Sequence, residues 1–162
     1  MVSFSTMKLT IRTTSPDETV ALGERLGKQL QPGDVIALYG DLGAGKTTLT
    51  RGIAVGLGLD ADIHSPTFTL IHEHPGRVHL YHVDLYRLST EQEVETLGLE
   101  EYIYSEGVTV IEWGDRMKSI LPAERLDITL RMTGDTDREL LFETQSERIG
   151  KVIGSLNADH SN

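Results

Sequence analysis

Apolar residues recur along this chain at two spacings, and each change of spacing marks the boundary of a predicted element. The segment KLTIRT, residues 8–13, alternates apolar and polar positions, which is typical of a strand with one buried face. The next segment has leucines four residues apart between positions 22 and 30, as on one face of a helix. Ser15 stands before that helix as a predicted N-cap, followed by a proline and by Glu18, which closes a capping box.

The rest of the chain continues this alternation of strand-like and helix-like segments. Further strands are predicted at DVIALYG (34–40), the end of DADIHSPTFTLIHEH (60–74), RVHLYHVDLYRL (77–88), VTVIEW (108–113), RLDITLRM (125–132) and RELLFET (138–144). Further helices are predicted from Gly45 through Leu57, in STEQEVETLGLEEYI (89–103, a helix and then a turn or second short helix), and at Glu147 to Leu156. The two strands that flank TGDTD are expected to form a hairpin.

Length and composition narrow the class of protein. A chain of 162 residues suits a single domain, residues 1–162, and we expect disordered tails at 1–6 and 157–162. Cysteine is absent, which argues against disulfides and thiolate metal sites. The N-terminus does not resemble a secretion signal and no segment is long and apolar enough to span a membrane, so we expect a cytoplasmic protein that does not bind membranes.

The net charge of −10, from 25 acidic and 15 basic residues, opposes direct binding to a nucleic-acid backbone. A role in a nucleic-acid pathway would therefore be expected to depend on a protein partner.

A glycine-rich loop between a predicted strand and a predicted helix carries the clearest chemical signal. LYGDLGAGKTTLTRG, residues 38–52, contains the spacing G-x-x-x-x-G-K-[ST] from Gly40 to Thr47. Backbone N–H groups of such a loop cradle phosphates, its lysine reaches the terminal ones, and the helix N-terminus adds its positive dipole end. The alternative is a glycine-rich turn with a surface lysine. The residues expected at the phosphates are Gly43, Ala44, Gly45, Lys46 and Thr47.

A bound triphosphate requires Mg²⁺, which prefers oxygen ligands, and Thr47 offers the first through its hydroxyl. The second is usually a carboxylate at the end of an apolar strand, and two strands end this way, VTVIE at Glu112 and LYHVD at Asp84. We expect Glu112 on the metal side. Asp84 is expected in the outer coordination sphere or as the group that orients the attacking water. Alternatively, either carboxylate caps a turn or pairs with Arg87 or Arg116.

Three further features are less specific. Thr67, in HSPTFTL, lies in a segment that would have to pass over the γ-phosphate in order to sense it. A Ser-Pro turn before a strand explains the pattern equally well. Five of the six histidines fall between positions 64 and 82, but their spacing does not place three ligands together, so polar strand and loop surface is favoured over a transition-metal site. Trp113 follows Glu112 directly and is expected on the opposite face of the strand.

The class of phosphate-loop protein can be narrowed further. The N-K-x-D and D-x-x-G segments of GTP-binding switches do not occur in the chain, which favours ATP. A small-molecule kinase remains an alternative, although an arginine-rich lid is not evident. A nucleotide-binding interaction module that never hydrolyses is a third possibility, against which the two strand-end carboxylates argue.

Four segments in this order resemble the bacterial TsaE (YjeE) family, the ATPase component in biosynthesis of the threonylcarbamoyladenosine modification of tRNA. They are GDLGAGKTTLTRG (40–52), SPTFTL (65–70), HVDLYRL (82–88) and IEWGD (111–115). The resemblance covers roughly Ser15 to Phe142. It implies an α/β chain with a three-layer, P-loop NTPase-like fold and a mixed central sheet.

The same resemblance implies a Mg²⁺-dependent ATPase that is slow alone. Its partners would be TsaD and TsaB, with TsaD transferring the threonylcarbamoyl group to the adenosine beside the anticodon. The tRNA would be met only indirectly, through that complex.

Individual roles also follow from the resemblance. It implies that Lys46 neutralises the β- and γ-phosphates, that Thr47 and Glu112 hold Mg²⁺, and that Thr48 caps the α-phosphate. Thr67 becomes the switch residue. Further implied roles are hydrolysis for Asp84, a function beyond packing for Trp113, and adenine contacts near Thr14, Ser15 and Arg138.

Overall fold

The computed structural model describes residues 6–41, 43–60, 71–85, 88, 90–95, 98–103, 105–113 and 121–160. The strands are β1 (Met7–Thr13), β2 (Val35–Tyr39), β3 (Ile71–His74), β4 (Leu80–Asp84), β5 (Val108–Glu112), β6 (Leu126–Met132) and β7 (Arg138–Thr144). The helices are α1 (Pro16–Gly27), α2 (Lys46–Gly56), α3 (Glu91–Glu95), α4 (Glu100–Ile103) and α5 (Glu147–His160).

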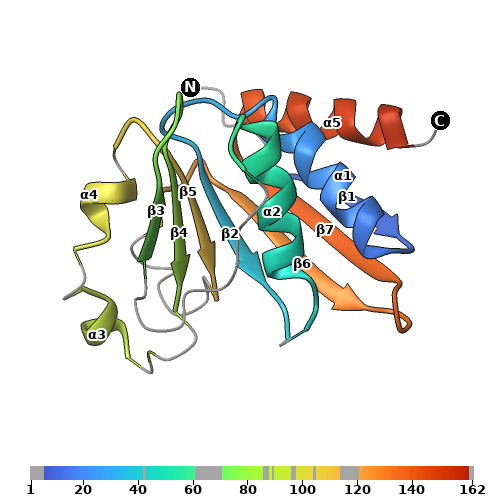
Figure 1. Ribbon diagram of the computed structural model, residues 1–162, viewed down its shortest axis with the longest axis horizontal. Helices are drawn as coiled ribbons and strands as arrows, with labels where there is room; N and C mark the ends of the chain where they lie inside the picture. Colours follow the sequence, from blue (N-terminus) through green and yellow to red (C-terminus); the bar gives the residue numbers. More distant parts are fainter. Residues whose placement is uncertain are drawn as a thin grey trace.

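The strands form one seven-stranded mixed sheet in the order β1-β7-β6-β2-β5-β4-β3 (Figure 1). Strands β6, β2, β5 and β4 are parallel neighbours, whereas β1 and β7, β7 and β6, and β3 and β4 pair antiparallel. The expected hairpin is the β6–β7 pair. This arrangement confirms the predicted α/β fold with a mixed central sheet.

Helices and loops cover the sheet unequally on its two faces. Ile36 and Leu38 of β2 belong to a large apolar cluster with the buried residues of α1, α2 and α5. Val35 and Ala37 belong to a smaller cluster on the other face, together with Ile103 of α4. Because β2 is buried on both faces, its sequence VIALY is apolar throughout rather than alternating.

The structure confirms one of the predicted helical segments near the middle of the chain and extends the last predicted helix. The pattern at 89–103 forms two short helices, α3 and α4, in agreement with the expected helix and second short helix. Helix α5 continues past its predicted end at Leu156 to His160, so residues 157–160 are helical rather than part of a disordered tail. None of the helices in the described part of the chain is long and apolar enough to cross a membrane.

Helices α1 and α2 touch backbone to backbone, side by side on the sheet (Figure 1). Their contact is lined by Gly23 and Gly27 of α1 and by Gly52 and Gly56 of α2. A Cβ atom at Gly52 would lie only 2.2 Å from the carbonyl oxygen of Val20, and one at Gly27 would lie 2.4 Å from that of Ile53. Only glycine permits this approach, which fixes the position of α2 and of the residues at its first turn.

Replacing Gly52 by alanine is expected to lower the free energy of unfolding by about 1–3 kcal/mol or more, because the helices must move apart to admit one methyl group. The control is Gly154→Ala in α5, where the nearest atom to a new Cβ would be the terminal methyl of Met7 at 3.9 Å. There we expect unchanged or slightly higher stability, since alanine favours the helix. Urea denaturation of both variants measures the difference, and equal effects at the two sites would contradict the close-contact argument.

Candidate functional site

The glycine loop follows the carboxyl end of β2 and leads into the first turn of α2. Gly40, Gly43 and Gly45 have positive φ angles of 142°, 81° and 105°. A Cβ at Gly40 would also lie 2.5 Å from the carbonyl oxygen of Leu130. Gly45 is the N-cap of α2, so the first-turn N–H groups have no capping side chain at this position and can receive an anion. The predicted strand, loop and helix are thus confirmed in the predicted order.

The ammonium group of Lys46 lies inside this loop. Its Nζ donates hydrogen bonds to the carbonyl oxygens of Gly40 at 2.7 Å and Asp41 at 2.9 Å. The same nitrogen lies 4.1 Å from the centroid of the Trp113 ring, which is a cation–π contact. Only 5% of the residue is exposed, so the loop holds a nearly buried positive charge at the place expected for phosphates.

Thr47 contacts Glu112 beside the loop, and Asp84 lies next to Glu112 in the strand register. Glu112 ends β5 and is buried, and the Thr47 hydroxyl donates to its Oε2 at 3.3 Å. Asp84 ends the neighbouring strand β4 directly opposite Glu112 and is half-buried. Parallel strands end at one edge of the sheet, which explains why residues far apart in sequence come together here.

The Thr47 hydroxyl and the Glu112 carboxylate are suited to bind Mg²⁺. A threonine hydroxyl and a carboxylate already in contact are hard donors of the kind that Mg²⁺ prefers. Among the described residues, no three side chains of His, Cys, Asp or Glu are grouped so as to hold a metal by themselves. The donor set therefore suits a cation that takes its remaining ligands from nucleotide oxygens and water.

Trp113 turns away from Glu112, as expected from its place in the sequence. Its side chain packs against the smaller apolar cluster, on the sheet face opposite α2. Its backbone has a φ of 66°, which is unusual for a large residue, and its N–H donates to the carbonyl oxygen of Leu38 at 2.9 Å. This backbone conformation accompanies the contact between the Trp113 ring and Lys46, which was not predicted from the sequence.

His82 corrects the interpretation of the histidine-rich segment as polar surface. It is fully buried in β4, and its Nε2 is hydrogen-bonded to Oε2 of Glu112. The carboxylate at the end of β5 supplies the polar partner that makes this burial possible. His79, by contrast, is partly exposed and lies 3.3 Å from a Glu73 carboxylate oxygen, and His64 lies outside the described residues.

Arg138, at the start of β7, contacts the glycine loop. Its Nε donates to the carbonyl oxygen of Ala44 at 3.1 Å and its Nη2 to that of Gly43 at 3.3 Å. Its Nη1 donates to carbonyls of the β6–β7 turn, among them that of Asp137 at 2.9 Å. The guanidinium thus ties the hairpin to the loop. The adenine contact that the family resemblance implies for Arg138 stays a prediction.

A small cavity of about 80 Å³ adjoins the loop. Its lining includes Pro16, Thr19, Gly45, Thr48 and Arg138. Ser15 is the residue before Pro16, and its hydroxyl accepts the Glu18 N–H at 3.1 Å, which confirms it as the N-cap of α1. The Glu18 carboxylate reaches back to the hydroxyl and N–H of Thr14 rather than to Ser15. Adenine contacts by Thr14 and Ser15 remain predictions.

Tyr39, at the end of β2, links this strand to β6 next to the glycine loop. Its hydroxyl donates to Oδ1 of Asp127 at 3.0 Å, and the same oxygen accepts from Arg125 Nε at 2.9 Å. Burial, followed by the charge of Asp127, raises the pKa of Tyr39 far above its usual value. The phenol therefore stays protonated and holds β2 to β6 immediately before Gly40.

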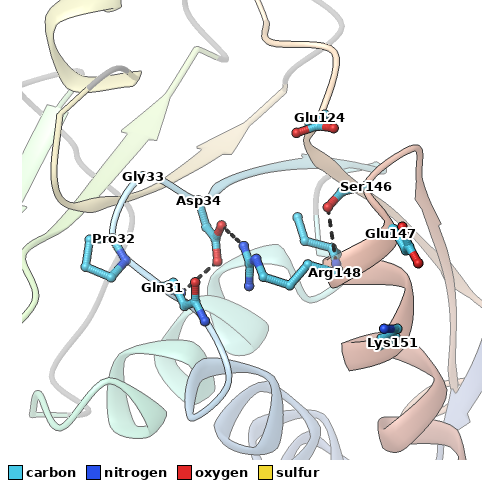
Figure 2. Close-up of a pocket in the computed structure, with 10 residues that line it drawn as sticks. Gln31, Pro32, Gly33, Asp34, Glu124, Ser146, Glu147, Arg148 and Lys151 are labelled. Carbon is cyan, nitrogen blue, oxygen red and sulfur yellow. Dashed lines mark hydrogen bonds and ion pairs between the residues drawn. The ribbon is translucent and has the colours of Figure 1, made fainter. Parts of the chain in front are cut away.

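A larger cavity of about 700 Å³ lies at the other end of β2 (Figure 2). Figure 2 shows the Asp34 carboxylate meeting the Arg148 guanidinium, and the same carboxylate accepts the Gln31 N–H at 2.7 Å. The buried charge of Asp34 is thus already paired. This cavity lies at the opposite end of β2 from the glycine loop. The smaller cavity is the one that adjoins the predicted phosphate-binding residues.

Thr67, the predicted switch residue, lies outside the described residues, as do Arg87 and Arg116. Its role stays a prediction. The site residues that were not predicted from the sequence, above all His82, are those whose contacts join segments distant along the chain.

Comparisons with known proteins agree on one family. The family model described as "Threonylcarbamoyl adenosine biosynthesis protein TsaE" matches residues 13–140. The tRNA threonylcarbamoyladenosine biosynthesis protein TsaE of Bacillus subtilis is 46% identical over 147 residues, which cover 90% of this chain and 92% of that protein. The protein of the same name from Treponema pallidum is 44% identical over 126 residues, which cover 78% of this chain and 93% of that one.

A solved structure extends this agreement to three dimensions. The crystal structure of YdiB from Bacillus subtilis superposes with a TM-score of 0.80 at 38% sequence identity, covering 99% of this chain and 100% of that one. The P-loop NTPase-like fold predicted from the sequence is thereby confirmed.

Replacing Arg138 by alanine is expected to weaken ATP binding by about 10- to 100-fold, because the loop carbonyls lose a charged donor worth about 1.5–3 kcal/mol. Arg131→Ala is the control, since this arginine of β6 pairs with Glu139 and its side chain is 71% exposed. Isothermal titration calorimetry with ATP and Mg²⁺ compares the two variants. A similar loss in both would show that the loop contact of Arg138 is not what supports binding.

Proposed function

Because this chain belongs to the TsaE family of threonylcarbamoyl adenosine biosynthesis proteins, we propose that it is a Mg²⁺-dependent ATPase in that pathway. One observation carries the proposal beyond family membership. The Lys46 ammonium, the Thr47 hydroxyl and the Glu112 carboxylate converge at a loop whose glycines leave the first turn of α2 open to an anion. This combination of groups suits a nucleoside triphosphate with its metal ion.

Each side chain has a defined task in the proposed reaction. Lys46 exchanges its two loop carbonyls for the β- and γ-phosphate oxygens, so its charge passes from a neutral to an anionic partner. Gly43, Ala44 and Gly45 offer backbone N–H groups to the phosphates, and Thr48 lies at the cavity beside them. Thr47 and Glu112 hold Mg²⁺, which when bound neutralises charge on the phosphate oxygens.

Asp84 is the group proposed to act on the attacking water. It lies opposite Glu112 in the β4–β5 pairing and is half-buried, so it can reach the reaction site without being sealed from solvent. A carboxylate at this place can orient the water or accept its proton. Thr67 is proposed to sense the γ-phosphate.

The proposed partners are TsaD and TsaB, with tRNA met only through their complex. The net charge of −10 supports an indirect role, because an acidic protein is repelled by the tRNA backbone. The lack of cysteine agrees with a cytoplasmic location.

ATP hydrolysis by the purified protein is expected to be slow, to rise when TsaD and TsaB are added, and to collapse in Glu112→Gln, because the amide binds Mg²⁺ poorly. Glu124→Gln, at an exposed carboxylate near the other end of β2, is the control and should behave as the unaltered protein. Released phosphate is the readout. Transfer of phosphate to a small-molecule acceptor, without stimulation by the partners, would favour a kinase instead.

Asp84→Asn is expected to lower turnover by about 10²–10⁴-fold, the usual contribution of a positioned acid or base. Its affinity for ATP and Mg²⁺ should change little, because the proposed phosphate and metal contacts come from other residues. Single-turnover hydrolysis and calorimetry separate the two effects. Loss of nucleotide affinity in proportion to turnover would instead place Asp84 among the binding residues.

A further inference from the structure

We propose that His82 is a positioning residue that holds the Glu112 carboxylate for Mg²⁺, a role that rests on the proposed metal site. His82 is fully buried in β4, and Glu112 ends the adjacent strand β5. The His82 Nε2 and Glu112 Oε2 are hydrogen-bonded. Strand pairing places His82 between His72 of β3 and Val110 of β5, so its backbone is fixed on both sides.

The contacts of Glu112 show why a second donor is needed. Its Oε2 accepts from both the Thr47 hydroxyl and His82, whereas Oε1 receives no donor from the part of the chain that the structure describes. The Thr47 hydroxyl would bind the metal through its oxygen, and its hydrogen can then stay on Oε2 or turn away. His82 is fixed in β4 and would keep a donor on Oε2 in either case, so that Oε1 would stay oriented as a ligand.

The chemistry of the pair makes His82 the donor. An ionised carboxylate only accepts hydrogen bonds, so the hydrogen must lie on Nε2. The Nδ1 atom is buried and has no hydrogen-bond partner among the described residues. The bond from Nε2 to Glu112 is therefore the hydrogen bond that the described residues offer to this imidazole.

The unpaired nitrogen also argues against a purely packing role. A buried polar atom without a partner destabilises the folded state, and an aliphatic residue would fill the same space without that cost. A histidine at this position is explained by what its other nitrogen does for Glu112.

Two substitutions at His82 separate positioning from packing. His82→Leu keeps an apolar side chain but removes the donor, whereas His82→Gln retains an N–H group at about the reach of Nε2 and lacks Nδ1. His79→Leu, on the same β3–β4 hairpin but partly exposed, is the matched control.

The decisive measurement is ATP affinity by calorimetry over a range of Mg²⁺ concentrations and in EDTA. We expect His82→Leu to require about ten-fold or more Mg²⁺ for half-maximal tightening, the usual effect of losing the partner of a metal ligand. Its affinity in EDTA should be unchanged. His82→Gln and His79→Leu should match the unaltered protein.

A second readout needs no ligand. Nitrogen-15 NMR of the imidazole should show a hydrogen on Nε2, and Glu112→Gln should shift the Nε2 signal. This result tests the pair even if His82→Leu does not fold. An Nε2 that carries no hydrogen, or an Nε2 signal unaffected by Glu112→Gln, overturns the proposal.

The outcomes distinguish this proposal from the proposed function. If the unaltered protein binds ATP equally with and without Mg²⁺, the metal site fails and the role of His82 fails with it. If Mg²⁺ tightens binding and His82→Leu behaves as the unaltered protein, only the role of His82 is overturned. Equal losses in EDTA and in Mg²⁺ would reduce His82 to a structural residue.

Discussion

The backbone contact between α1 and α2 is the constraint on which the site depends. Four glycines let the helices approach until a single methyl group would collide with a carbonyl oxygen of the other helix. Helix α2 cannot slide or tilt against α1 without losing this fit, and the apolar cluster beneath holds both helices to the sheet. Since Lys46 and Thr47 form the first turn of α2, the rigidity of the helix pair passes directly to the groups expected to bind phosphate and metal.

The sheet contributes the other half of the site. Leu38, Glu112 and Asp84 stand in one row across the parallel strands β2, β5 and β4, so the carboxylates are set by strand register. Lys46 links the two halves, because its ammonium lies among loop carbonyls on one side and against Trp113 on the other. The site is thus assembled from one helix end and one sheet edge. Arg138 donates a hydrogen bond to the loop between them, and Tyr39 holds β2 to β6 just before the loop.

Local patterns in the sequence predicted the glycine-rich loop, the strand before it and the helix after it, since all three lie within one short segment. The strand-end carboxylates were also predictable, because parallel strands place their last residues at a common edge. Contacts between distant segments were not. The role of the glycines at 23, 27, 52 and 56 is evident only from the packing of α1 against α2. Arg138 donates to the carbonyl oxygen of Ala44, which is 94 positions away in the sequence. His82 was taken for surface because its hydrogen-bond partner belongs to another strand.

The contact between Lys46 and Trp113 has a practical consequence. Trp113 is the single tryptophan of the chain, so the tryptophan emission comes from one place, beside Lys46 at the edge of the glycine-rich loop. A cation near an indole ring changes the energy and lifetime of its excited state, and the cation here is the side chain expected to move when phosphates arrive. For the proposed binding of nucleotide, the protein therefore carries its own optical probe, and attaching a dye is unnecessary.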